Sequence, residues 1–257
     1  MRIQRVDIDG IPALEVAQKS QWDQPLPLVV FQHGGTNDKE VVAGYGVELA
    51  KRGFRVVLPD ALKHGENNYA PIRQISDYFE VWEDGVYRLP GILDYYRESI
   101  KDDFIGVGGL SLGGYMTNMQ MVKYPEISAM VSLMAGVDTA GAIRTSLSKR
   151  HGQREESVLP LEDYPHSQVL IDYNLGENLE ALNGRPMYFW HSKDDHWVPF
   201  RFTYYPLTDN RALPTLDQVE FKITDGDEHV VPCHVFERQA SFMEEAYLKH
   251  LEKRQES

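Results

Sequence analysis

The feature that most constrains the fold is an alternation of short apolar runs with helical patterns along the chain. The runs are rich in Val, Ile, Phe and Leu, and their near-continuous apolarity is typical of strands covered on both faces. They lie at residues 27–33, 54–60, 104–110, 127–136, 185–192 and 216–223. Strands that alternate with helices predict an α/β protein with a mostly parallel sheet and helices on both faces.

Helical stripes occupy several of the intervals between these runs. Apolar residues recur at helical spacing before Gly53, from Ile75 to Leu93, after Ser111 and from Phe236 to Tyr247,. Two earlier stretches, at residues 3–8 and 12–17, alternate apolar and polar residues and flank Asp9-Gly10, a two-residue hairpin signal,. We expect these two stretches to form an antiparallel edge of the sheet.

Length, charge and cysteine content bound the class of protein. A chain of 257 residues can bury one sizeable core, so we expect a single domain over residues 1–257,. The net charge of −13 and the lack of a basic run argue against nucleic acid and anionic membranes as partners,. Cys233 stands alone, and no secretory signal or membrane-spanning stretch is apparent,. We expect a cytoplasmic protein, and homo-oligomerisation stays open.

One region, at about residues 137–185, breaks the alternation because it is polar, irregular and too long for an ordinary connection,. Two interpretations are open. The region is a surface insertion of one or two short helices, or it is a helical lid over the functional site. In the second case Tyr164, Tyr173 and Leu175 would line a pocket.

The decapeptide GVGGLSLGGY at residues 106–115 places Ser111 among glycines. A phosphate-binding loop would need a lysine where Gly114 stands, and a dinucleotide-binding loop would need a glycine in place of Ser111,. Residues 109–113 instead match G-x-S-x-G, between a predicted buried strand and a helix. This is the context of a nucleophile elbow, whose tight turn requires small residues beside the exposed serine.

An elbow serine also needs donors for an oxyanion. The sequence FQHGGT at residues 31–36 ends the first buried run, and its glycines let backbone N–H groups turn toward the site,. We predict that the amides of Gly35 and Leu112 form the oxyanion hole. His33 is expected to hold this loop and to take no part in the chemistry.

Two later strand ends carry the residues that could activate the serine. The segment HSKDDHWVP at residues 191–199 and the segment DGDEHVVP at 225–232 each follow an apolar run. The chain order serine, acid, histidine is a known order for a catalytic triad, in which the acid orients the base. We predict Asp195 as the acid and His229 as the base, with Asp194 and His234 as their alternatives.

With these motifs the sequence resembles the α/β-hydrolase superfamily, and within it the small bacterial carboxylesterases of the YitV/YjfP type, related to dienelactone hydrolases and prolyl oligopeptidases. The resemblance also includes VVFQHGGTNDKE, VSLMAG and the segment PDALKHGE at residues 59–66, and it runs over essentially the whole chain. It implies that the acid of the H-G-x-x-D-x-x-V-P pattern is Asp195, although Ser192 stands where glycine is usual. His64 and Glu66 could act as metal ligands or as a second base, and we favour the interpretation that they fix a loop beside the site.

We therefore expect a serine carboxylesterase that hydrolyses small, short-chain esters without a cofactor or a metal. Met116 and Trp197 are the residues that we expect to contact the apolar part of the substrate. A prolyl-oligopeptidase-like peptidase, a thioesterase and a sugar deacetylase are compatible with the same triad. The alternative from another class is a catalytically silent hydrolase fold that serves as a ligand sensor, which would not need all of Ser111, Asp195 and His229.

Overall fold

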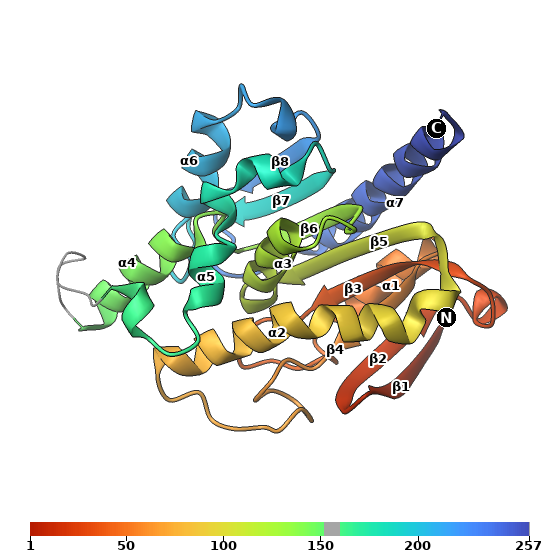
Figure 1. The fold of residues 1–257 in the computed structure, drawn as a ribbon, viewed down its shortest axis with the longest axis horizontal. Helices are drawn as coiled ribbons and strands as arrows, with labels where there is room; N and C mark the ends of the chain where they lie inside the picture. Colours follow the sequence, from red (N-terminus) through yellow and green to blue (C-terminus); the bar gives the residue numbers. More distant parts are fainter. Residues whose placement is uncertain (152–159, 257) are drawn as a thin grey trace.

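The computed structural model describes residues 1–151 and 160–256, in which one eight-stranded sheet is flanked by helices (Figure 1). The sheet order is β1-β2-β4-β3-β5-β6-β7-β8, with β1 and β2 antiparallel and the strands from β4 to β8 parallel. The strands are β1 (Arg2–Ile8), β2 (Ile11–Ala17), β3 (Leu26–Gln32), β4 (Arg55–Pro59), β5 (Ile100–Leu110), β6 (Ala129–Leu133), β7 (Met187–Ser192) and β8 (Val219–Thr224).

The helices from α1 to α6 lie in the connections between parallel strands, and α7 follows the last strand. They are α1 (Ala43–Lys51), α2 (Ile75–Tyr96), α3 (Leu112–Lys123), α4 (Thr139–His151), α5 (Gln168–Asp172), α6 (Arg201–Asp209) and α7 (Cys233–Glu256). Short 3-10 turns are η1 (Lys19–Gln21), η2 (Arg97–Ser99), η4 (Leu161–Asp163), η5 (Leu175–Glu177), η6 (Leu179–Leu182) and η7 (Pro214–Leu216). In the described part of the chain no helix combines the length and the apolarity that crossing a bilayer requires.

The core has two layers because successive side chains of a strand point to opposite faces of the sheet. Along β3, Leu28 and Val30 belong to the apolar cluster that includes α2 and α3. Val29 and Phe31 belong to the opposite cluster, which includes α1 and α7. All four side chains are fully buried. Coverage of both faces explains why the parallel strands read as continuous apolar runs in the sequence.

The antiparallel edge is built by the predicted hairpin. Asp9 and Gly10 have φ angles of 50° and 87°, so both residues of the two-residue turn are left-handed, as a type I′ turn requires. β1 and β2 pair in register from Arg2 with Ala17 to Ile8 with Ile11. The predicted strands and the predicted order of elements are confirmed.

The structure adds one helix that the sequence did not predict. α6 follows β7 and contains Pro206 in its interior, a residue that weakens any helical pattern read from sequence. The region at residues 137–185 begins with α4 and continues, beyond residues 152–159, with short helical pieces. That this region is a lid stays a prediction.

Candidate active site

Ser111 lies at the turn between β5 and α3, at the carboxyl edge of the sheet. Its backbone has φ 52° and ψ −113°, a conformation that non-glycine residues rarely adopt,. The turn is held because the Ser111 N–H donates to the Leu133 carbonyl oxygen at 2.8 Å and its own carbonyl accepts from the Tyr115 N–H at 3.0 Å. The tight turn lifts the side chain of Ser111 clear of the strand and the helix.

The glycines on either side are required by close backbone approach. A Cβ atom on Gly109 would lie 2.4 Å from the carbonyl carbon of Gly113, and one on Gly113 would lie 2.4 Å from the carbonyl oxygen of Gln32. Real Cβ atoms do not come this close to backbone atoms. A larger residue at Gly109 would therefore force β5 and α3 apart at the turn, and one at Gly113 would force α3 away from the end of β3,.

Three strand ends bring Ser111, His229 and Asp195 into one hydrogen-bonded chain. His229 Nε2 lies 2.9 Å from Ser111 Oγ, and His229 Nδ1 lies 2.7 Å from Asp195 Oδ2. The carboxylate can only accept, so Nδ1 carries the ring proton and Nε2 is left to accept the proton of the serine hydroxyl. This is the tautomer that a general base for Ser111 needs.

The Asp195 carboxylate is 5% exposed and is surrounded by N–H donors. Oδ1 accepts from the backbone N–H groups of Trp197 at 2.9 Å and Val198 at 2.8 Å. Oδ2 lies 3.1 Å from His191 Nε2 as well as near His229. Burial raises the pKa of Asp195, but the hydrogen bonds from His191 and His229 outweigh it and lower the pKa to about 2,. Asp195 is therefore a carboxylate at neutral pH.

The two alternatives from the sequence lie in other places. Asp194 Oδ2 accepts the backbone N–H of Gly226 at 2.5 Å and so ties the loop after β7 to the loop after β8. His234 is exposed in the first turn of α7. The histidine that approaches Ser111 is His229, and the carboxylate that approaches His229 is Asp195.

The two predicted oxyanion donors, Gly35 and Leu112, line the same cavity as Ser111 and His229. Leu112 is the first residue of α3, so its N–H has no acceptor within the helix,. The positive end of the helix dipole adds to the attraction for a negative oxygen there. The role of these amides stays a prediction.

His33 holds the loop that carries Gly35. Its Nε2 accepts the backbone N–H of Ala61 at 3.0 Å, so its Nδ1 carries the proton and donates to the Gly34 carbonyl oxygen at 2.7 Å. Burial lowers the pKa of His33, because the charged ring would lose its hydration,. The ring therefore joins the loops after β3 and β4 as a neutral group, which agrees with the structural role expected from the sequence.

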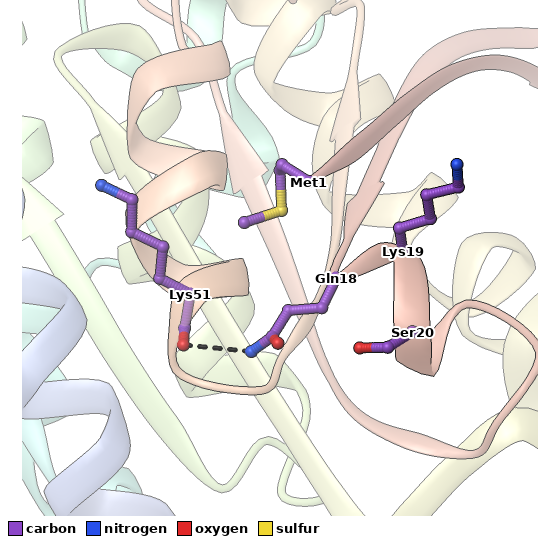
Figure 2. A pocket seen from close by; sticks show the side chains of 5 residues that line it. All are labelled: Met1, Gln18, Lys19, Ser20 and Lys51. Carbon is purple, nitrogen blue, oxygen red and sulfur yellow. Dashed lines mark hydrogen bonds between the residues drawn. The ribbon is translucent and has the colours of Figure 1, made fainter.

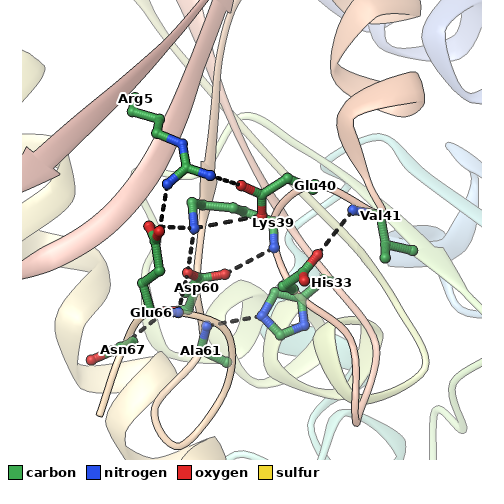
Figure 3. Close-up of polar contacts among 10 residues, drawn as sticks. Arg5, His33, Lys39, Glu40, Val41, Asp60, Ala61, Glu66 and Asn67 are labelled. Carbon is green, nitrogen blue, oxygen red and sulfur yellow. Dashed lines mark hydrogen bonds and ion pairs between the residues drawn. The ribbon is translucent and has the colours of Figure 1, made fainter. Parts of the chain in front are cut away.

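A charged cluster fixes the same two loops (Figure 3). Lys39 is 1% exposed, and its Nζ lies 2.6 Å from Asp60 Oδ2 and 2.9 Å from Glu66 Oε2. Arg5 of β1 pairs with Glu66 and with Glu40 at the surface. Burial lowers the pKa of Lys39, but the hydrogen bonds to Asp60 and Glu66 outweigh it and raise the pKa. The sequence analysis missed Lys39 because a lysine in a polar loop usually points to solvent.

The contacts of Glu66 and His64 agree with the interpretation that these residues anchor a loop. Glu66 belongs to the Lys39 cluster, and His64 is buried with its Nδ1 2.8 Å from the Leu62 carbonyl oxygen. Within residues 1–151 and 160–256, three His, Cys, Asp or Glu side chains nowhere gather in a way that could hold a metal ion.

A cavity of about 750 Å³ opens beside Ser111. Its walls combine Ser111 and His229 with apolar and aromatic side chains from α2, α3, α4 and the loop after β7. They are Gly35, Thr36, Ile72, Ile75, Tyr78, Trp82, Ser111, Leu112, Tyr115, Ile143, Ser146, His196, Trp197, Val198 and His229. Trp197 is 79% exposed at this wall, as a residue that contacts substrate could be.

The prediction for Met116 was wrong. Its side chain is fully buried in the core and does not line the cavity. It fills the space above Gly85 of α2, where an added Cβ would lie 2.6 Å from its sulfur atom. Tyr115, the preceding residue of α3, is the one that reaches the cavity.

The three residues of the region at 137–185 that would line a pocket under the lid interpretation do not line this cavity. Tyr164 packs edge-on against Phe79, Tyr173 accepts a hydrogen bond from Lys123 Nζ at 2.8 Å, and Leu175 is fully buried. The region reaches the cavity through Ile143 and Ser146 of α4 instead. The apolar pattern could place these residues in contact with a core, but it could not say which core.

A second hollow lies between the start of β1, the segment after β2 and the end of α1, and Figure 2 shows the side chains that line it. It is lined by Met1, Gln18, Lys19, Ser20 and Lys51, and Gln18 Nε2 donates to the Lys51 carbonyl oxygen at 3.1 Å. Met1, Lys19, Ser20 and Lys51 are exposed, and Gln18 is half-buried. The described residues that line this hollow include no histidine, aspartate or glutamate.

Comparison with known proteins agrees with this architecture. A family model for the alpha/beta hydrolase fold matches residues 27–156. The chain is 28% identical over 246 residues to a protein of Bacillus subtilis (strain 168) named "Putative esterase YitV", with 90% of this chain and 94% of that protein covered. It is 25% identical over 209 residues to "Esterase YjfP" of Escherichia coli (strain K12), with 77% and 80% covered.

Solved structures show the same fold at lower sequence identity. TT1662 from Thermus thermophilus superposes with a TM-score of 0.74 at 18% identity, over 95% of this chain and 97% of that one. Est1E from Butyrivibrio proteoclasticus, in a structure with ferulic acid bound, gives a TM-score of 0.65 at 17% identity, over 96% and 99%. The fold expected from the sequence is confirmed.

Proposed function

Because the chain belongs to the alpha/beta hydrolase fold family, we propose that it is a serine carboxylesterase that hydrolyses small, short-chain carboxylic esters through an acyl-enzyme. The observation that carries the proposal is the continuous path from Asp195 through His229 to Ser111, with contacts of 2.7 Å and 2.9 Å. The esterase names of YitV and YjfP support the same reaction class.

In the first half of the reaction, Ser111 Oγ attacks the ester carbonyl carbon while its proton passes to His229 Nε2. Asp195 stabilises the imidazolium that results, since it is already ionised and already bonded to Nδ1. The carbonyl oxygen becomes an oxyanion, which the amides of Gly35 and Leu112 stabilise. His229 then returns the proton to the departing alcohol, and the C–O bond breaks to leave acyl-Ser111.

In the second half, a water molecule takes the place of the alcohol. His229 Nε2 accepts a proton from this water as it attacks the acyl carbonyl, and the same two amides hold the second oxyanion. Collapse of this intermediate breaks the bond to Ser111 Oγ, and the proton on His229 returns to the serine. The carboxylic acid leaves and the enzyme is restored.

The walls of the cavity indicate a neutral substrate. Among the described residues that line it, none is Lys, Arg, Asp or Glu, so His196 and His229 are the only wall side chains that could carry a charge,. The net charge of −13 further disfavours anions,. A volume of about 750 Å³ exceeds what an acetyl group needs, so the remaining space would take the alcohol part of the ester.

The test is a series of p-nitrophenyl esters from acetate to octanoate, with the wild type and Ser111→Ala. We expect turnover that is highest for the short acyl chains and absent from the variant, together with covalent labelling of the wild type alone by a fluorophosphonate. A thioester and a p-nitroanilide of the best acyl group separate esterase from thioesterase and peptidase. Absence of both turnover and labelling would favour the ligand-sensor alternative.

A further inference from the structure

A second histidine, His191, contacts the same carboxylate oxygen of Asp195 as His229 does. It is the fifth residue of β7, is fully buried, and lies four residues before Asp195. Its Nε2 lies 3.1 Å from Asp195 Oδ2 and 3.0 Å from the Val198 carbonyl oxygen. Its Nδ1 lies 2.7 Å from Thr203 Oγ1 of α6.

The surroundings of His191 fix where its ring proton lies. Both atoms near Nε2 are acceptors, a carboxylate oxygen and a carbonyl oxygen, so Nε2 must carry a hydrogen to avoid two repulsive contacts. Thr203 can donate to Nδ1 or accept from it, since its hydroxyl also lies 3.0 Å from the Ala135 carbonyl oxygen. The N–H at Nε2 is therefore required whether the Thr203 hydroxyl donates to His191 Nδ1 or to the Ala135 carbonyl oxygen.

We propose that His191 is a positioning residue, whose Nε2–H holds the Asp195 carboxylate in the orientation and ionisation state that the catalytic base requires. This inference rests on the proposed function, because it concerns the acid of the same triad. Oδ2 receives His229 and His191 on its two lone pairs, so the second histidine supports the first without displacing it,. The Trp197 and Val198 amides hold Oδ1, which leaves the carboxylate no freedom to rotate.

The geometry gives His191 a second effect on the same turn. Its Nε2–H also reaches the Val198 carbonyl oxygen, while the Val198 N–H reaches Asp195 Oδ1 at 2.8 Å. One ring thus closes the turn at residues 195–198 and bonds the carboxylate at its start. The ring itself is fixed from α6 through Thr203, so the position of the acid depends on an element that lies outside the triad.

Two variants separate this role from simple filling of the core. In His191→Gln the side-chain amide nitrogen can occupy the place of Nε2 and still donate to Asp195, whereas in His191→Asn the shorter amide reaches only the place of Nδ1 and Thr203. We expect His191→Gln to keep kcat within about threefold. We expect His191→Asn to lose about ten- to hundredfold in kcat, the usual range for a lost hydrogen bond to a charged group, with KM little changed.

The melting temperature of each variant is the control for folding, and Thr203→Val, which leaves the Nε2–H in place, should lose less kcat than His191→Asn. Equal kcat in the Gln and Asn variants, whether both high or both low, would overturn the proposal.

A spectroscopic measurement does not depend on these variants or on turnover. In the wild type, ¹⁵N NMR of the imidazole rings should show Nε2 of His191 protonated from pH 5 to 9, with its proton shifted strongly downfield. Asp195→Asn should move that proton signal upfield, because an amide oxygen is a weaker acceptor than a carboxylate. An unprotonated Nε2, or a proton that ignores Asp195→Asn, would overturn the proposal. Failure of the proposed function would appear separately, as a wild type without esterase turnover.

Discussion

Asp60 and Asp195 are two buried carboxylates at the carboxyl ends of parallel strands, after β4 and β7, and are 1% and 5% exposed. Each carboxylate accepts hydrogen bonds from two backbone N–H groups. Those of Lys39 and Glu66 donate to Asp60 at 2.9 Å and 2.8 Å. Those of Trp197 and Val198 donate to Asp195. They differ in the side chains that complete the set. Asp60 is paired with the ammonium of Lys39, and Asp195 with the imidazoles of His191 and His229.

The difference separates a structural carboxylate from one able to serve in proton transfer. Lys39 keeps its proton at any physiological pH, because its hydrogen bonds raise its pKa further, so the pair with Asp60 is a fixed link. Imidazole is the side chain that most often acts as a general acid and base, so the proposed proton transfer would change the charge opposite Asp195 during a reaction cycle. One edge of the sheet thus holds two similar buried carboxylates, one that anchors loops through Lys39 and one that bonds to His191 and His229.

The largest expected effect is on kcat, and it comes from replacing Asp195. Asp195→Asn should lower kcat for the best p-nitrophenyl ester by about four orders of magnitude, because the amide disfavours the tautomer of His229 that accepts the serine proton. The melting temperature should change far less than kcat does. Asp194→Asn is the matched control, since its side-chain oxygen can still accept the Gly226 N–H, and it should stay within about tenfold of the wild type. A loss at Asp194 equal to that at Asp195 would contradict the assignment of the acid.

At Asp60 we expect the effect to appear in stability instead. Asp60→Asn leaves the buried ammonium of Lys39 without its closest counter-charge, which should lower the free energy of unfolding by about 3 to 5 kcal/mol in urea titrations. The kcat of the folded variant should stay within about tenfold. Glu40→Gln removes a half-exposed partner that lies 3.5 Å from Lys39 Nζ, and should cost less than about 1 kcal/mol,. A large loss of kcat at unchanged stability would show that Asp60 acts in the chemistry.

A third expected effect is on the pH dependence of stability. Because the pKa of Asp195 is lowered to about 2 in the folded state and is about 4 in an unfolded chain, its contribution is fully present above about pH 4. That contribution is lost as the pH falls through about 2, and it should amount to about 2.5 kcal/mol. Unfolding titrations from pH 5 to 2 should therefore give a shallower slope for Asp195→Asn than for the wild type. Equal slopes would mean that the hydrogen bonds to Asp195 do not favour the ionised form of its carboxyl group.

The smallest expected effect comes from Trp197, which supports Asp195 through its backbone and not through its side chain. Its N–H donates to Oδ1 at 2.9 Å, while the side chain is 79% exposed at the wall of the cavity. Trp197→Ala should therefore leave kcat nearly unchanged and lower kcat/KM by less than about tenfold, most for esters of bulky alcohols. A hundredfold loss of kcat would show that the indole helps to position the acid.

Much of the fold could be predicted because its strands are short, apolar and separated by clear helical stripes. The site could be predicted in part, because G-x-S-x-G and two strand-end segments place Ser111, Asp195 and His229 in order. The choice between Asp194 and Asp195 came from the family resemblance, since adjacent carboxylates differ only in which way the turn directs them. The structure directs Asp194 to Gly226 and Asp195 to His229.

What could not be predicted depended on packing between distant segments. The residues from Leu112 to Met121 in α3 are all buried. The helix therefore has no solvent-exposed face over these residues, and its sequence pattern could not separate Met116 in the core from Tyr115 at the cavity. The aromatic wall from Tyr78 and Trp82 is set by how α2 lies across the sheet. His191 could have been noticed from its position four residues before Asp195, but its hydrogen bond depends on the closed turn at 195–198.

The backbone of Ser111 has a thermodynamic consequence for how this chain can evolve. A serine at φ 52° and ψ −113° is strained by about 1 to 3 kcal/mol, while a glycine adopts such angles freely and loses about 1 kcal/mol at most in added chain entropy,. Selection for thermal robustness alone would thus favour replacing Ser111 by glycine. A chain that keeps serine there bears a standing cost in stability, and that cost is sustained only while the hydroxyl is in use.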